Sequence, residues 1–93
     1  MSGAVDLRRG RRKKVTVVFV SDEWPTVRFR LRVGDLTVAK AIRLIRADEQ
    51  MPYPRAPFMV RIRGEGKPEN KYHEVSKDSR LVLTEEHILM VEG

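Results

Sequence analysis

The chain has 93 residues, of which 41% are hydrophobic and 34% are charged, and its formal net charge is +6. This length supplies a core for only one small domain, and the positive charge favours acidic partners over basic ones. The sequence contains no cysteine, which excludes disulfide bonds, thiolate nucleophiles and cysteine metal sites.

The sequence also lacks the apolar segments that direct a chain to a membrane. No apolar run approaches the roughly 18 to 20 residues needed to cross a bilayer. The N-terminus has no apolar stretch that resembles a signal peptide. We therefore expect no membrane span and a location in the cytoplasm or the nucleus.

Residues 1–14 differ in composition from the rest of the chain. Six of the last seven residues of this segment are Arg or Lys, and Val5 and Leu7 are its only larger apolar groups after Met1. Like charges repel and the apolar supply is poor, so we expect a disordered basic arm. It is either a solubilising extension, a nuclear-import signal or a nonspecific phosphate-binding tail. The folded domain is expected to span residues 15–93.

The first half of this domain is typical of a β-hairpin. Residues 15–20 are rich in β-branched side chains, and Ser21, Asp22 and Pro25 supply the turn that follows. Residues 27–33 then alternate strictly between apolar and basic side chains, the period-two pattern of a strand with one buried face. The basic members are Arg28, Arg30 and Arg32.

A helix and a third strand follow the hairpin. Thr37 is placed to cap a helix, and Val38, Ala41, Ile42 and Ile45 recur at the spacing of one helical face. Three prolines then make residues 51–57 a stiff connection. Residues 58–63 alternate again and predict a third strand, which ends at the turn of residues 64–68.

The C-terminal part leaves two alternatives for the strand that closes the sheet. Residues 81–83 and residues 88–91 are both strand-like, and the two segments are separated by Thr84-Glu85-Glu86-His87. If the earlier segment closes the sheet, about nine residues project as a flexible tail. If the later one does, almost nothing projects.

This order of elements predicts an α+β fold, a single β-grasp (ubiquitin-like) domain. The expected architecture is a mixed sheet of four to five strands with one helix packed across it. The expected core consists of Val15, Val17, Phe19, Val27, Phe29, Leu31, Val38, Ile42, Ile45, Phe58, Val60 and Ile62.

Several segments resemble the ubiquitin-fold modifier family. They are residues 14–33 with the Ser21-Asp22 turn, Asp35-Leu36-Thr37-Val38, Gly64-Glu65-Gly66-Lys67-Pro68 and the final Gly93. The stretch Asp35-Leu36-Thr37-Val38 with Leu44-Ile45-Arg46 is also similar to the autophagy-related ubiquitin-like modifiers. Glu92 departs from the valine that precedes the final glycine in the first family.

The resemblance implies a protein modifier that is conjugated through Gly93. A processing protease exposes the glycine, an activating enzyme adenylates it and takes it as a thioester, and a conjugating enzyme passes it to lysines of target proteins. Glycine suits this position because it lacks a side chain and passes through a narrow channel. The catalysis belongs to those enzymes, so the chain itself is expected not to be an enzyme.

A noncatalytic interaction domain is the alternative function. Arg28, Arg30, Arg32, Arg61 and Arg63 predict a basic surface that attracts acidic partners. Such arginines resemble those of Ras-association domains, and the same domain type also occurs within larger proteins. An apolar patch of Val18, Val20 and Met59 is a further candidate binding surface on the sheet face opposite the helix.

Other chemistry finds little support in the sequence. His73 and His87 lie far apart and are interpreted as surface or half-buried residues, so no metal site, cofactor or catalytic residue is expected. Phe19, Phe29 and Phe58 occupy core-facing strand positions and leave no aromatic platform for sequence-specific nucleic-acid binding. We expect a monomer.

Overall fold

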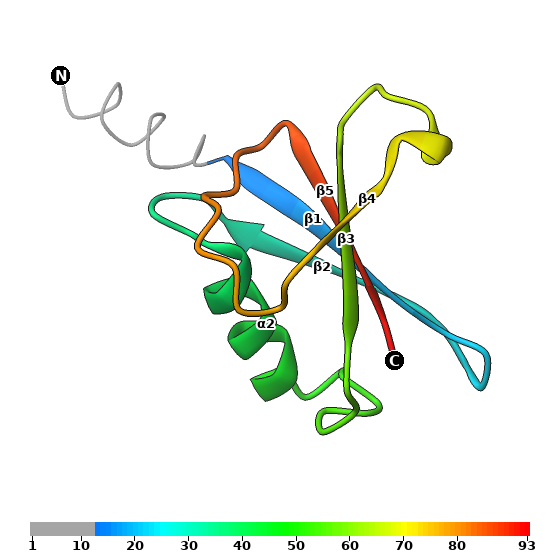
Figure 1. The fold of residues 1–93 in the computed structure, drawn as a ribbon. Helices are drawn as coiled ribbons and strands as arrows, with labels where there is room; N and C mark the ends of the chain where they lie inside the picture. Colours follow the sequence, from blue (N-terminus) through cyan, green and yellow to red (C-terminus); the bar gives the residue numbers. More distant parts are fainter. Residues whose placement is uncertain (1–12) are drawn as a thin grey trace, which may run out of the picture.

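A computed structural model of the chain describes residues 13–93. Its elements are β1 (Lys14–Ser21), β2 (Trp24–Arg32), α2 (Val38–Ala47), β3 (Met59–Gly64), the short 3₁₀ helix η1 (Glu69–Lys71), β4 (His73–Val75) and β5 (His87–Glu92). The strands form one mixed sheet in the order β2-β1-β5-β3-β4, and α2 lies across one of its faces (Figure 1). This is the predicted α+β, β-grasp arrangement. The expected disordered arm lies outside the described residues except for its last two positions.

The β1–β2 hairpin is the part that the sequence pattern predicts best. The strands pair antiparallel, from Lys14 opposite Arg32 to Phe19 opposite Val27, with an irregularity before the turn. Lys14 is therefore the first residue of β1, and our placing of it in a disordered arm was wrong. The ladder extends one residue further, because the amide of Val33 donates to the carbonyl of Lys13 at 3.0 Å.

Helix α2 confirms both the predicted cap and the predicted buried face. The Oγ1 atom of Thr37 accepts from the amide of Lys40 at 3.2 Å, which satisfies one free donor of the first turn. The buried residues of the helix are Val38, Ala41, Ile42 and Ile45. The apolar face of α2 thus packs on the sheet, as the spacing predicts.

Arg46 fastens the proline-rich connection to the end of α2. Its Nη1 atom donates to the carbonyls of Pro54 at 2.6 Å and Ala56 at 2.9 Å. Its guanidinium carbon lies 3.9 Å from the centre of the Phe58 ring. One half-buried arginine therefore holds together the helix, the connection and the start of β3.

The structure selects the later of the two candidate closing strands. β5 pairs parallel with β1 and antiparallel with β3, so it lies at the centre of the sheet. Residues 81–83 instead lie beside the start of α2. Val82 forms an isolated β-bridge with Thr37, and the amide of Leu83 donates to the carbonyl of Leu36. The alternative of a nine-residue projecting tail is therefore wrong, because residues 87–92 form β5.

The core confirms most of the expected residues. Ten of the twelve are buried, whereas Val27 and Leu31 are half-buried against the core from the edge strand β2. Within the described residues, six more are buried in the core: Leu36, Ala41, Met51, Leu83, Leu89 and Val91. Leu89 and Val91 are buried because β5 lies between two other strands. Within residues 13–93, no helix has the length and apolar character that a membrane crossing requires.

Candidate functional site: the open face of the sheet

The face of the sheet opposite α2, called here the open face, carries every residue that we expected to bind partners. Alternation sends Val15, Val17 and Phe19 of β1 into the core and leaves Thr16, Val18 and Val20 half-buried on the other side. On β5, Leu89 and Val91 are likewise buried, and Ile88 and Met90 are half-buried on the open face.

The strand register places the arginines on both sides of this apolar centre. Val18 lies opposite Arg28 on one side and Met90 on the other, and Met90 in turn lies opposite Arg61. The neighbouring row runs Arg30, Thr16, Ile88 and Arg63 in the same order. Residues that pair across strands share a face. The open face is therefore an apolar centre between two borders of arginine.

The open face is also slightly hollow. A depression of about 300 Å³ lies over β1 and β5, and Val18, Val20, Ile88 and Met90 form its apolar part. Thr26 and Arg28 border it on the β2 side, and Arg63, Tyr72 and the carboxylate-bearing Glu69 border it on the β3 side. Side chains of a partner therefore have a recess to enter.

The two arginine borders differ in how much of their positive charge is paired with carboxylates of residues 13–93. On the β2 side, Arg28, Arg30 and Arg32 are exposed and form no ion pair with any carboxylate of residues 13–93. On the β3 side, Arg61 forms an ion pair with Glu92. The β2 border therefore offers unpaired positive charge, whereas the charge of Arg61 is already neutralised.

Arg63 is fixed by its surroundings but keeps its charge. Its Nη1 atom donates to the carbonyls of Gly64 at 3.2 Å and Lys67 at 2.6 Å, and its guanidinium carbon lies 5.0 Å from the centre of the Tyr72 ring. Its buried Nε atom has no hydrogen-bond partner among residues 13–93. Carbonyl groups carry no net charge, so this border retains one immobilised cation.

The predicted apolar patch is only partly the one that forms. Val18 and Val20 belong to the depression, but Met59 lies at its periphery opposite Glu92, with 45% of its surface exposed. The sequence analysis missed Ile88 and Met90. Both faces of β5 are apolar, so the period-two signal that separates an inner from an outer face is absent there.

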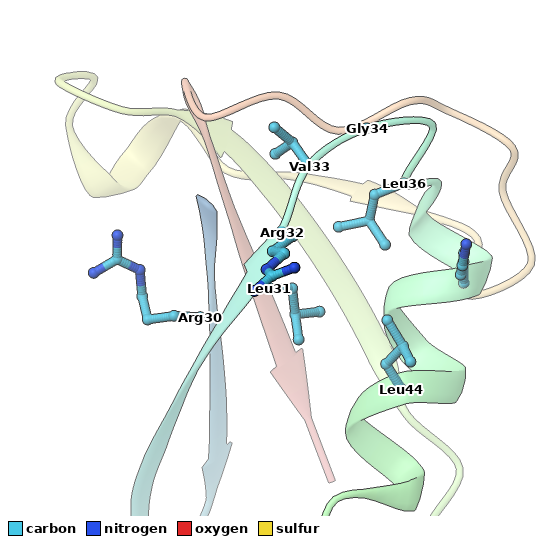
Figure 2. Close-up of a pocket in the computed structure, with 8 residues that line it drawn as sticks. Arg30, Leu31, Arg32, Val33, Gly34, Leu36 and Leu44 are labelled. Atoms are coloured by element: carbon cyan, nitrogen blue, oxygen red, sulfur yellow. The ribbon is translucent and has the colours of Figure 1, made fainter. Parts of the chain in front are cut away.

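A second surface lies around the edge of the sheet, between β2 and α2. This groove of about 510 Å³ is lined by Leu31, Leu36 and Leu44, with Arg30, Arg32 and Lys40 at its sides. In Figure 2 the three leucines turn toward the space between strand and helix, and Arg30 points to the other side of β2. Sequence analysis placed Leu31 in the core, and it named Leu44 only in a family resemblance and not as a binding residue.

Gly93 packs against the sheet directly after β5. Its amide donates to the carbonyl of Val20 at 3.1 Å. A β-carbon at this position would lie 2.8 Å from the Phe19 ring, closer than real contacts allow. Glycine at position 93 thus has a packing reason that is independent of conjugation.

The remaining titratable groups of residues 13–93 do not assemble a site. His73 is exposed, and the Nδ1 atom of the half-buried His87 accepts from the amide of Thr84 at 3.0 Å. Lys13 is exposed, and its hydrogen bond and ion pair with Glu85 raise its pKa. In the part of the chain described, no three His, Asp or Glu side chains are grouped so that they could hold a metal ion.

No protein-family model, no curated protein and no solved structure matches the chain.

Proposed function

We propose that the chain is a noncatalytic β-grasp interaction domain whose open face binds an acidic partner. One observation carries the proposal: an apolar, slightly hollow centre on β1 and β5 lies between arginines of β2 and β3. Apolar centres surrounded by charged groups are typical of protein-binding surfaces. The positive charge of the arginines selects a negatively charged partner, and the apolar centre supplies affinity.

The dimensions of the open face fit one helix of the partner. Arg28 and Arg63 are on strands three positions apart, a separation of about 14 Å at roughly 4.8 Å per strand. An α-helix with its side chains is about 10 to 12 Å wide. A helix along β1 and β5 would set an apolar stripe on Val18 and Met90 and its flanking carboxylates beside the arginines. We therefore propose an amphipathic helix with acidic flanks as the ligand.

Conjugation through Gly93 stays a prediction with a different structural requirement. An activating enzyme must reach the glycine carboxylate. The amide of Gly93 donates a hydrogen bond to the carbonyl of Val20. The end of β5 would therefore have to leave the sheet before the glycine could enter the activating enzyme. Binding through the open face requires no such opening, and for this reason we favour it.

The proposal is tested by titrating the labelled full chain with a synthetic helical peptide that has a leucine stripe between two rows of glutamate. We expect amide shifts on β1 and β5 and a salt-sensitive affinity. Arg28→Glu replaces attraction by repulsion and should weaken binding about tenfold, which corresponds to about 1.4 kcal/mol.

The matched control is Arg43→Glu, which makes the same charge change at an exposed position of α2. This control should alter the affinity by less than about twofold, since only the long-range charge changes. Equal losses in both variants, or shifts confined to α2, would contradict binding through the open face.

A further inference from the structure

The turn of the β1–β2 hairpin combines an exposed aromatic ring with carboxylates. Trp24 is 51% exposed, and the exposed residues Asp22 and Glu23 precede it in the turn. We propose that this turn binds a basic peptide segment of another protein, with an arginine of that segment over the Trp24 ring. The site is separate from the open face and stands or falls independently of the function proposed above.

Trp24 is held in place although it is exposed. Its ring lies 6.4 Å from that of the half-buried Tyr53, at an interplanar angle of 81°. The Tyr53 ring in turn lies 6.4 Å from that of the buried Phe19, and the carbonyl of Tyr53 accepts from the amide of Ala56 at 3.2 Å. Arg46 also fixes the Ala56 carbonyl. A ligand therefore meets a ring that is already positioned, and little side-chain freedom is lost on binding.

One face of the Trp24 ring is available to a cation. An edge-to-face contact covers at most one face of a ring, so Tyr53 leaves at least one face of Trp24 uncovered. The face of an aromatic ring is negative, and tryptophan attracts cations more strongly than tyrosine or phenylalanine does. Among residues 13–93, arginines lie over the rings of Phe58 and Tyr72, but no cation lies over Trp24.

The local charge selects a basic ligand. Residues 15–27 contain Asp22 and Glu23 and no Lys or Arg, although the whole chain carries a net charge of +6. Neither carboxylate forms an ion pair with another residue of the described part of the chain. Residues 48–57, which contain Tyr53, add two carboxylates and one arginine. Opposite charge at this turn therefore favours a cation where most of the surface repels one.

A small recess beside the turn has room for a second basic side chain of the ligand. Its volume is about 130 Å³, and its lining consists of Val20, Ser21, Asp22, Glu92 and Gly93. Ser21 is the cross-strand partner of Trp24, so the recess lies next to the aromatic ring. Glu92 is already paired with Arg61, which leaves Asp22 to bind the second cation. The ligand is therefore expected to carry more than one basic residue.

Charge and position argue against two occupants supplied by this chain. Two copies that met through the same turn would bring their carboxylates together, and like charges repel. Residues 1–12 contain four arginines, but they precede the opposite end of β1, about 26 Å from the turn at roughly 3.3 Å for each of its eight residues (Figure 1). The corresponding segment of a second copy has a suitable charge, and dilution separates it from a foreign ligand.

The test is a titration of the labelled full chain with a short peptide in which arginine alternates with glycine. Trp24 is the one tryptophan of the chain, so its indole N–H reports binding directly. We expect shifts of this group and of the amides of Asp22 and Glu23, with little change at Val18 and Met90. A peptide with citrulline in place of arginine keeps the shape and loses the charge, and it should bind about tenfold more weakly. Equal affinity for both peptides would overturn the proposal.

Trp24→Leu separates the aromatic face from simple apolar contact. It keeps an apolar side chain and should weaken binding about fivefold, whereas Trp24→Phe should lose less because it keeps a weaker aromatic face. The amides of Asp22 and Glu23 report binding in these variants. Val82→Ala is the control, because Val82 is also 51% exposed but lies beside the start of α2. Trp24→Leu with the affinity of the unchanged chain would show that no cation stacks on the ring.

Glu23→Lys and Glu65→Lys form a matched pair, since both residues are exposed and lie in turns at opposite ends of the sheet. Glu23→Lys should weaken binding about tenfold, and Glu65→Lys should change it by less than about twofold. Equal losses would reduce the effect to net charge and contradict a site at the turn.

Two further outcomes would also overturn the proposal. One is a tighter affinity for a proline-rich peptide without arginine, which would make the rings a proline site. The other is a shift of the Trp24 indole N–H when the chain is diluted without peptide, which would identify a second copy as the occupant.

Discussion

Replacing Phe19 by alanine is expected to lower the free energy of unfolding by about 3 to 5 kcal/mol. Phe19 is fully buried in β1, and its ring lies 5.7 Å from that of Phe58 and 6.4 Å from that of Tyr53. It therefore joins the hairpin, the proline-rich connection and the start of β3. A chain of this size is stable by roughly 5 to 14 kcal/mol, so the loss is a large part of the total. Chemical denaturation with both circular dichroism and fluorescence measures it.

Trp24→Ala is the control for this substitution. The Trp24 ring also contacts Tyr53 at 6.4 Å, but the residue is 51% exposed. Its removal should cost at most about 1.5 kcal/mol, the range of a single aromatic pair. A cost of Phe19→Ala no larger than that of Trp24→Ala would contradict the position of Phe19 at the centre of the core.

Arg46→Ala is expected to destabilise the fold by about 1.5 to 3 kcal/mol. The substitution removes the bonds to Pro54 and Ala56 and the contact with Phe58. Arg46→Lys should recover only part of the loss, because an ammonium group does not have the planar, forked geometry of guanidinium. Thermal unfolding of the unchanged chain, of Arg46→Ala and of Arg46→Lys measures the loss of stability.

Arg43→Ala is the matched control, because Arg43 lies on the same helix and is exposed. Its effect should stay within about 0.5 kcal/mol, as for other surface substitutions. If both alanine variants are equally stable, the connection is held by its prolines and not by Arg46.

The sequence predicts those parts of the fold in which local pattern and burial agree. The alternation in β2 and the spacing on α2 identify the buried faces correctly, because each element has one apolar and one polar side. The choice between residues 81–83 and 88–91 could not be made in this way. Both segments are apolar, and only pairing with β1 and β3, which are distant in sequence, distinguishes them.

The binding surfaces were predictable to different degrees. The arginines of β2 are visible in the alternating pattern. The apolar centre depends on Ile88 and Met90, which face the opposite side from Leu89 only because β5 is fixed between two strands. The groove depends on how closely Leu44 of α2 approaches Leu31 of β2. That distance is a property of packing between elements, and no local pattern encodes it.

Hydrogen exchange along β5 tests the account most directly, because Ile88 and Met90 are two of the four residues of the apolar centre and are in place only if β5 is a fixed strand. The account predicts slow exchange from Ile88 through Val91, comparable with that of Val17 in β1, since β5 is bonded on both sides. Fast exchange from Glu85 onward, with Val17 still protected, would contradict it: residues 87–92 would then be a mobile tail, and the open face would lose its centre.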